Sequence, residues 1–308
     1  MERILITGGA GFIGSWLAEA LLKTGRYHLT LLDNLSTGKR AHLPAPNTSS
    51  WSWIEGDANH RPTMEACMGD GGFDFVFHYA AVVGVQRTQE HPMKVLEDID
   101  GLKNILDLSH QHRVKRVFLA SSSEVYGEPV ELPQHEETTP LNSRLPYAVV
   151  KNLGEVMLRA YHKEYGLLYT IFRFFNTYGP RQSEDFVITR FVQQALRHAP
   201  ITLYGDGEQT RTFCHISDNI EATTAAMMQG HFINDVVNIG NPNQISIRAL
   251  AEHIIAETQS RSPIIHLPAL EDGDMQRRQP DTRKMEQLLP RALKSLQEGL
   301  KDTIAYLR

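Results

Sequence analysis

Short apolar runs alternate with amphipathic stretches through the first half of the chain. The apolar run at 4–6 precedes a helical pattern at 12–24, and a second apolar run, 29–32, ends at Asp33. The same order recurs, with strands predicted at 51–57, 73–81, 114–120 and 170–176 and helices at 92–112 and 147–165. Because strands that alternate with helices pair in parallel, the pattern predicts an α/β fold with a doubly wound parallel sheet.

The alternation becomes less regular after Gly179-Pro180. Helices are predicted at 186–198, at 218–229 and from Ser246 onward, with strands at 201–204 and 236–239. Residues 271–282 are charged and contain Gly and Pro, which predicts a loop. We expect two interleaved domains: a larger one, 1–176 plus about 212–240, and a smaller α/β substrate-binding one, 177–211 plus about 241–308.

Three glycines, Gly8, Gly11 and Gly14, follow the first predicted strand and lead into the first predicted helix. A backbone that turns sharply and brings its N–H groups against a pyrophosphate has no room for Cβ atoms. Such a turn can also occur without a ligand. Asp33, at the end of the second strand, lies near the spacing of about 20 residues at which a carboxylate binds the ribose of a dinucleotide.

The strand, the glycine turn, the helix and Asp33 together predict a Rossmann-type dinucleotide site. A carboxylate repels a 2′-phosphate, so Asp33 favours NAD over NADP, although the cations Arg26, Lys39 and Arg40 lie close in sequence. Small residues at the end of the predicted strand 73–81 would let a cofactor lie close to the sheet. Asp57, at the end of another strand, fits a ligand position and an ordinary Gly-Asp turn equally well.

The overall composition excludes several other function classes. The 308 residues carry a formal net charge of −5, which gives no general attraction to nucleic acid or to an anionic membrane. No apolar stretch reaches the ~20 residues of a membrane span, and we expect a cytoplasmic protein. Cys67 and Cys214 are isolated and the fourteen histidines lack ligand spacing, so neither a disulfide framework nor a metal site is predicted.

Tyr147 and Lys151 lie four residues apart on a predicted helix, so they share one face. An ammonium group beside the phenol would lower its pKa toward neutrality and make Tyr147 a usable general base. Ser121–Ser123, at the end of the fifth predicted strand, could hold the reacting oxygen. Such a Tyr–Lys pair is common by chance, and it gains weight because it follows the glycine turn and the serine cluster.

The ordered motifs resemble those of the extended short-chain dehydrogenases/reductases, in particular the nucleotide-sugar epimerase, dehydratase and decarboxylase group. The resemblance covers nearly the whole chain, through the segments 7–14, 33–38, 78–81, 121–127, 146–151, 173–181 and 204–211. It implies that the larger domain binds NAD and the smaller one binds a nucleotide sugar, with a UDP-sugar expected. The implied cofactor-binding residues are Gly8, Gly11, Phe12, Ile13, Gly14, Asp33, Asn34, Ser36, Thr37, Gly38, Asp57, Ala58, Ala80, Ala81, Tyr147 and Lys151.

The resemblance also implies a reaction cycle. Tyr147 takes the proton of the sugar's 4-hydroxyl while NAD+ takes the C4 hydride, Ser122 assists, and Lys151 bonds the nicotinamide ribose. The 4-keto sugar then rotates or loses a group, and NADH returns the hydride. Glu124 is a further catalytic candidate, because a carboxylate near C5 could act as a second acid or base.

The implied substrate-binding residues are Arg87, Ser122, Ser123, Asn176, Arg181, Tyr204, Arg211 and Arg278. Arginines that converge on a diphosphate would make bidentate, charge-assisted hydrogen bonds, although each one alone could be a surface charge. The helices at 92–112 and 147–165 correspond to a dimer interface in the group, so we expect a homodimer. Burial of these helices within one chain is the alternative.

The motifs do not agree on the net reaction. Glu124 and the segment Arg278–Asp281 resemble decarboxylases, residues 82–88 resemble epimerases, and Ser123 replaces the Asp of the dehydratases' triplet. Asp98 stands where the group usually has Asn. The leading hypothesis is an NAD-dependent nucleotide-sugar 4-epimerase that acts on a UDP-hexose or UDP-hexuronate, with a UDP-glucuronate decarboxylase or a dehydratase as alternatives. A non-catalytic NAD-binding regulatory protein is the alternative from another class.

Overall fold

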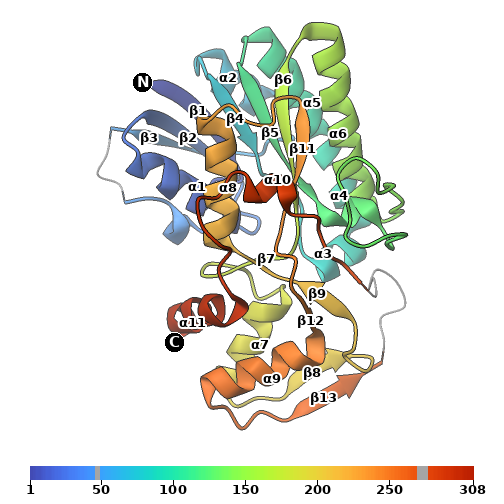
Figure 1. Cartoon of the computed structure of the whole chain (residues 1–308). Helices are drawn as coiled ribbons and strands as arrows, with labels where there is room; N and C mark the ends of the chain where they lie inside the picture. The colour runs from blue at the N-terminus through green and yellow to red at the C-terminus, as the bar shows by residue number, and fades with distance from the viewer. Residues whose placement is uncertain (46–48, 269–276) are drawn as a thin grey trace.

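A seven-stranded parallel sheet forms the centre of the molecule (Figure 1). The computed structural model describes residues 1–45, 49–268 and 277–308. The strand order is β11-β6-β5-β4-β1-β2-β3, which confirms the predicted doubly wound sheet. The strands are β1 (Glu2–Thr7), β2 (Tyr27–Asp33), β3 (Trp51–Glu55), β4 (Phe75–His78), β5 (Arg116–Ser122), β6 (Leu168–Phe174) and β11 (Asp235–Ile239).

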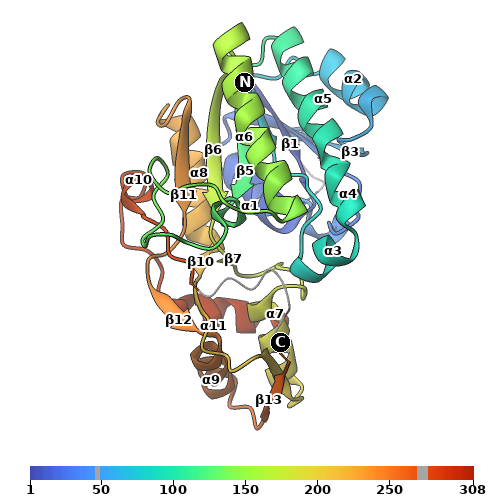
Figure 2. The ribbon, with the colours of Figure 1, turned by 90° about the vertical axis from the view of Figure 1, so that its right-hand side faces the viewer.

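Helices cover both faces of this sheet (Figure 2). One face carries α1 (Phe12–Lys23) and α8 (Ile216–Met228), and the other carries α2 (Arg61–Gly69), α5 (Asp98–Gln111) and α6 (Pro146–Tyr165). Strands that are covered on both sides are mostly apolar, which is why much of their sequence reads as apolar runs. None of the described helices is long and apolar enough to cross a membrane.

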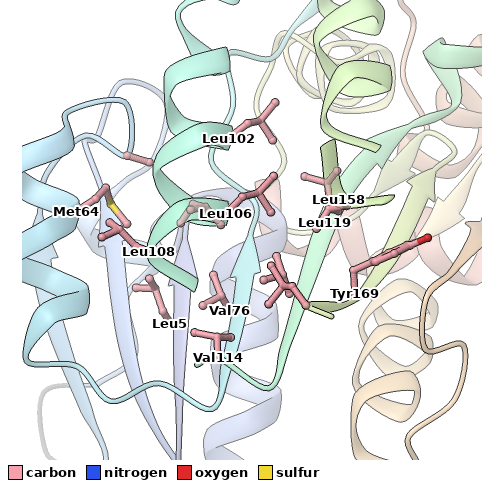
Figure 3. Packing of buried hydrophobic residues seen from close by; sticks show 14 of the residues in the cluster. Leu5, Met64, Val76, Leu102, Leu106, Leu108, Val114, Leu119, Leu158 and Tyr169 are labelled. Atoms are coloured by element: carbon pink, nitrogen blue, oxygen red, sulfur yellow. The ribbon is translucent and has the colours of Figure 1, made fainter. Parts of the chain in front are cut away.

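The layer between the sheet and α5 shows how these faces are held together (Figure 3). Leu5, Val76 and Leu119 project from β1, β4 and β5 against Leu102 and Leu106 of α5. All five side chains are at least 95% buried. Fully burying one such side chain contributes about 1.5–3 kcal/mol, so this layer holds the strand ends in fixed positions.

The prediction of one continuous helix at 92–112 is wrong, because the helix is interrupted. The structure has α4 (Pro92–Leu96) and α5, with Glu97 between them. The amide of Asp100 bonds to the carbonyl of Glu97, a contact three residues apart that tightens the chain at this point. Among the described α-helices, four were not predicted at all: α2, α3 (Val85–Glu90), α10 (Arg283–Glu286) and the C-terminal α11 (Leu296–Leu307).

A second group of elements lies below the carboxyl ends of the sheet strands in Figure 1. Its core joins α7, α9 and α11 through residues such as Phe191, Leu250 and Leu300. The further elements are β7 (Thr177–Tyr178), α7 (Val187–Leu196), β8 (Ile201–Tyr204), β9 (Thr210–Thr212), β10 (Cys214–His215), β12 (Gln244–Ser246), α9 (Ile247–Thr258) and β13 (Ile264–Leu267). The short helix α10 (Arg283–Glu286) instead packs beside β11 of the central sheet. The assignment of separate cofactor and substrate domains stays a prediction, and residues 271–276 of the predicted loop lie outside the described part.

Candidate active site

A cavity of about 930 Å³ lies at the carboxyl ends of the sheet strands. The order of the strands reverses at β1. From β1 the chain adds β2 and β3 on one side of the sheet, and then crosses over to add β4, β5 and β6 on the other side. Ligands of open α/β sheets bind at such a reversal of strand order. The predicted site residues that line the cavity are Gly8, Gly11, Phe12, Ile13, Gly14, Asp33, Asn34, Ser36, Thr37, Asp57, Ala58, Ala80, Ala81, Ser122, Ser123, Glu124, Tyr147, Lys151, Asn176 and Arg278.

The glycine turn is built so tightly that it excludes side chains. Gly8 has a φ of +72°, and a Cβ at Gly14 would lie 2.2 Å from the Gly8 carbonyl oxygen. The Gly11 amide bonds to the same oxygen at 3.0 Å, and α1 begins one residue later. The amide groups at the start of α1 therefore lie in the cavity wall, where they fit the pyrophosphate of a dinucleotide.

Asp33 is fixed at the end of β2, with its carboxylate on the cavity wall. It accepts hydrogen bonds from the amides of Leu35, at 2.8 Å, and Ala10, at 3.1 Å. Burial raises the pKa of Asp33, and these backbone donors oppose the rise. A Cβ at Gly38 would lie 2.8 Å from Asp33 Oδ1, so Gly38 supports the carboxylate from behind and does not itself line the cavity.

A polar chain continues from Asp33 along the same wall. Asn34 donates to Asp57 Oδ2 at 2.9 Å, and Asp57 Oδ1 accepts from the Asn59 amide at 2.8 Å. The side chains of Asn34 and Asp57, which are suited to bind a ribose, are thus held in place by hydrogen bonds within this chain of residues. The glycine turn, the anchored Asp33 and this chain all fit NAD.

Ser122, Tyr147 and Lys151 converge on the other side of the cavity. Ser122 ends β5, while Tyr147 and Lys151 lie on successive turns of α6, which starts at Pro146. Ser122 accepts from the Glu124 amide at 3.1 Å and shares a hydrogen bond with the Tyr147 hydroxyl. The ammonium of Lys151 lies 5.7 Å from the centre of the Tyr147 ring.

The predicted lowering of the Tyr147 pKa by Lys151 is wrong for the chain by itself. Burial raises the pKa of Tyr147, the bond to Ser122 opposes this, and the charges of Glu124 and Asp98 add to the rise. Burial also lowers the pKa of Lys151 to about 8, against an upward influence of Asp98. The phenol is therefore held neutral, because the interior disfavours its anion more than the protein's own charges favour it.

Glu124 and Arg278 form an ion pair inside the cavity. Arg278 Nη2 donates to Glu124 Oε1 at 2.9 Å, and its Nη1 donates to Ser123 Oγ at 3.1 Å. Arg278 is only 4% exposed. The pair therefore joins the end of β5 to the C-terminal part of the chain and places two opposite charges beside Ser122 and Tyr147.

Behind the cavity, a second buried ion pair supports the end of β5. Arg173 donates to Glu155 at 2.9 Å and 2.7 Å, one bond to each carboxylate oxygen. Ser121, next to Ser122, donates to the same carboxylate at 2.7 Å. This network fixes the strand end that carries Ser122 against α6.

Several predicted substrate residues do not line the cavity in the described structure: Arg87, Arg181, Tyr204 and Arg211. Arg181 pairs with Glu19 at 2.5 Å and lies over the Trp16 ring, so its contacts are with α1. Arg87 pairs with Asp185 at 3.1 Å. Their roles in binding stay predictions.

Other cavity-lining residues were not predicted as site residues, among them Asn59, Asp98, Tyr178, Gln182, Phe186 and Phe213. Tyr178 lies on β7, inside the segment 173–181 that carries the resemblance, whereas Phe186 and Phe213 lie outside the segments that carry it. Asp98 alone gave a signal, as an acidic residue at a position where the group usually has an amide.

A family model supports the interpretation of this cavity. Residues 4–240 match the NAD dependent epimerase/dehydratase family. Among the relatives, the chain is 37% identical to a UDP-N-acetyl-alpha-D-glucosaminuronate decarboxylase of Bacillus cytotoxicus, over 100% of this chain and 98% of that protein.

Solved structures give the same fold with other net reactions. A UDP-glucose 4-epimerase of Thermotoga maritima, solved with UDP-glucose, superposes with a TM-score of 0.91 and 32% identity over 99% of this chain and 98% of its own. A dTDP-glucose 4,6-dehydratase of Streptomyces venezuelae, solved with NAD, has a TM-score of 0.91 and 28% identity, over 99% and 96%. Three different net reactions therefore occur on closely similar chains.

Proposed function

The chain belongs to the NAD dependent epimerase/dehydratase family and is an NAD-dependent nucleotide-sugar enzyme, and from this premise we propose that it acts on a UDP-sugar through oxidation at C4. The net reaction proposed first is 4-epimerisation, in which the hydride returns to the opposite face of the sugar. One observation carries the proposal: Ser122, Tyr147 and Lys151 line the same cavity as the glycine turn and Asp33.

Each residue of this trio has a distinct role in the proposal. Tyr147 removes the proton of the 4-hydroxyl, Ser122 bonds the reacting oxygen, and the Lys151 ammonium favours the phenolate as it forms. NAD+, when bound, supplies the hydride acceptor and a positive charge. Since the protein alone raises the pKa of Tyr147, the positive charge of Lys151 matters for the proton transfer.

Decarboxylation of a UDP-hexuronate is the second candidate, and the Glu124–Arg278 pair favours it. A 4-keto uronate is a β-keto acid, so it loses carbon dioxide readily and then needs a proton donor at C5. Inversion at C4 makes no use of a buried carboxylate and guanidinium beside the reacting hydroxyl. The similarity to a uronate decarboxylase supports the same candidate.

Product analysis separates the two candidates. Purified protein is incubated with UDP-glucose, UDP-N-acetylglucosamine and UDP-glucuronate, and the products are identified by NMR and mass spectrometry. The proposal expects a sugar inverted at C4. Loss of carbon dioxide from UDP-glucuronate would replace epimerisation by the second candidate, and no turnover of any nucleotide sugar would overturn both.

A homodimer is proposed through α4 and α6. These two helices pack against each other and expose Met93, Leu96, Val149 and Val156, each between 37% and 73% exposed. Covering such residues would remove apolar surface from water. Light scattering tests this proposal: the mass of two chains supports it, and the mass of one chain overturns it.

A further inference from the structure

Lys151 is a buried cation without a direct partner. Its side chain is 6% exposed and lines the cavity. Within the ranges that the structure describes, its ammonium donates no hydrogen bond and has no carboxylate within 4 Å. A buried charge of this kind is costly unless another charge stabilises it.

Asp98 is the carboxylate that acts on Lys151. It is the first residue of α5, it lines the same cavity, and α5 packs against α6. Its Oδ2 accepts from the Val82 amide at 2.8 Å, and its Oδ1 accepts from Asn59 at 3.5 Å. Burial raises the pKa of Asp98, and the Val82 donor, the charge of Lys151 and the position at a helix N-terminus oppose this rise.

An amide side chain would satisfy the same Val82 donor, so the hydrogen bond does not require a charge at this position. The other groups near the pair do not replace that charge. The pKa of His78, on β4, is lowered to about 3, so His78 is neutral at physiological pH. Tyr147 is neutral too. The charge of Asp57 raises the pKa of Asp98, and the charges of Glu124 and Arg278 raise and lower the pKa of Tyr147, respectively.

We propose that Asp98 is a positioning residue, whose fixed carboxylate keeps the buried Lys151 in its charged form at the cavity wall. The inference rests on the proposed function, in which that ammonium favours the Tyr147 phenolate. Burial lowers the pKa of Lys151 and the charge of Asp98 raises it. Burial has the larger effect, so the pKa of Lys151 is about 8. Without the carboxylate only burial remains, and the lysine becomes neutral at a lower pH.

The test measures the protonation of Lys151 directly. Protein labelled with ¹³C-lysine is titrated by NMR, and the Lys151→Arg variant assigns the signal. Asp98→Asn keeps the oxygen that accepts from Val82 but removes the charge, and the Lys151 midpoint should fall by roughly one pH unit. Asp98→Glu should bring it back toward the wild-type value. Asp100→Asn makes the same charge change at an exposed site of α5 and should leave the midpoint unchanged.

An unchanged Lys151 midpoint in Asp98→Asn would overturn the inference. If that variant does not fold, titration of Asp98 in a Lys151 variant tests the same inference, because the interaction between two charges shifts the pKa of both groups. Lys151→Met should then raise the midpoint of the Asp98 carboxyl, and an unmoved Asp98 would overturn the inference. A wild-type protein that converts no nucleotide sugar would overturn the proposed function and leave these titrations valid.

Discussion

Helix α6 carries two buried charged centres, one turn apart, that differ in how they are paired. At Glu155 the carboxylate meets Arg173 through two hydrogen bonds and also accepts from Ser121. At Lys151 the ammonium faces the cavity, with Asp98 acting from a distance. Burial lowers the pKa of Lys151, whereas the contacts with Glu155 outweigh burial at Arg173 and raise its pKa.

This difference separates a structural centre from a reactive one. The Glu155–Arg173 pair has its charges satisfied and supports the end of β5 that carries Ser122. Lys151 makes no hydrogen bond or ion pair among the residues that the structure describes, so its charge is available to a ligand or to Tyr147. Two adjacent turns of one helix thus have different roles: Glu155 orders the site, and Lys151 takes part in the proposed chemistry.

The largest expected effect is on turnover, at the reactive centre. Tyr147→Phe removes the proposed base and should lower turnover about 10²- to 10⁴-fold. The measurement is the rate of product formation from whichever UDP-sugar the wild type converts. The free energy of unfolding, measured by urea denaturation, should stay within about 1 kcal/mol of the wild type, since the ring is retained. Unchanged turnover would remove Tyr147 from the mechanism.

At the structural centre we expect a loss of stability. Glu155→Ala leaves Arg173 as an unpaired buried charge and should lower the free energy of unfolding by about 3–5 kcal/mol in urea denaturation. Arg159 is the matched control, because it also contacts Glu155 but has a side chain that is 42% exposed. Arg159→Ala should cost less than about 1 kcal/mol. Equal losses in the two variants would contradict the contrast between paired and exposed charges.

Asp33 tests the cofactor side of the same cavity. Asp33→Asn removes the charge that is predicted to bond the ribose hydroxyls, and NAD affinity measured by calorimetry should fall about 10- to 100-fold. The same change removes the repulsion of a 2′-phosphate, so the preference for NAD over NADP should shrink. If the variant kept the full preference for NAD, Asp33 would not be its source.

The smallest expected effect is the contribution of Lys151 to the pH dependence of stability. Between pH 8 and its ordinary value of 10.5, the unfolded chain holds a proton on this lysine that the folded chain has lost. The free energy of unfolding of the wild type should therefore rise with pH in this window, relative to Lys151→Met. Urea denaturation near pH 8 and near pH 10 measures the difference, and a constant difference would mean that the Lys151 pKa is not lowered.

The parallel sheet and the glycine turn could be predicted because their causes are local. Strands buried on both faces are mostly apolar, and the Gly8–Gly14 contact has no room for a Cβ. The break at Glu97 was not predictable from the apolar spacing of residues 92–112. Asp98, directly after the break, accepts hydrogen bonds from Val82 and Asn59, and no periodicity encodes such tertiary contacts.

In the candidate site, too, features with local causes could be predicted and features that depend on tertiary contacts could not. Residues in contiguous motifs, such as Ser122 and Tyr147, come together as predicted, because the motif itself is the strand end or the helix face. Arg181 does not line the cavity, since its partners Trp16 and Glu19 lie on α1, far away in the sequence. The Tyr147 pKa was predicted in the wrong direction because burial, the largest influence, cannot be counted from sequence.

Transfer of a label at C4 tests the central claim most directly. UDP-glucose and UDP-glucuronate that carry deuterium at C4 are incubated with the purified protein, and the products are examined by NMR and mass spectrometry. If the C4 hydride leaves and returns within one cavity, the product should be altered at C4 or C5 and should still carry deuterium at C4. A product whose C4 deuterium has exchanged with water, or no product from either sugar, would contradict the account.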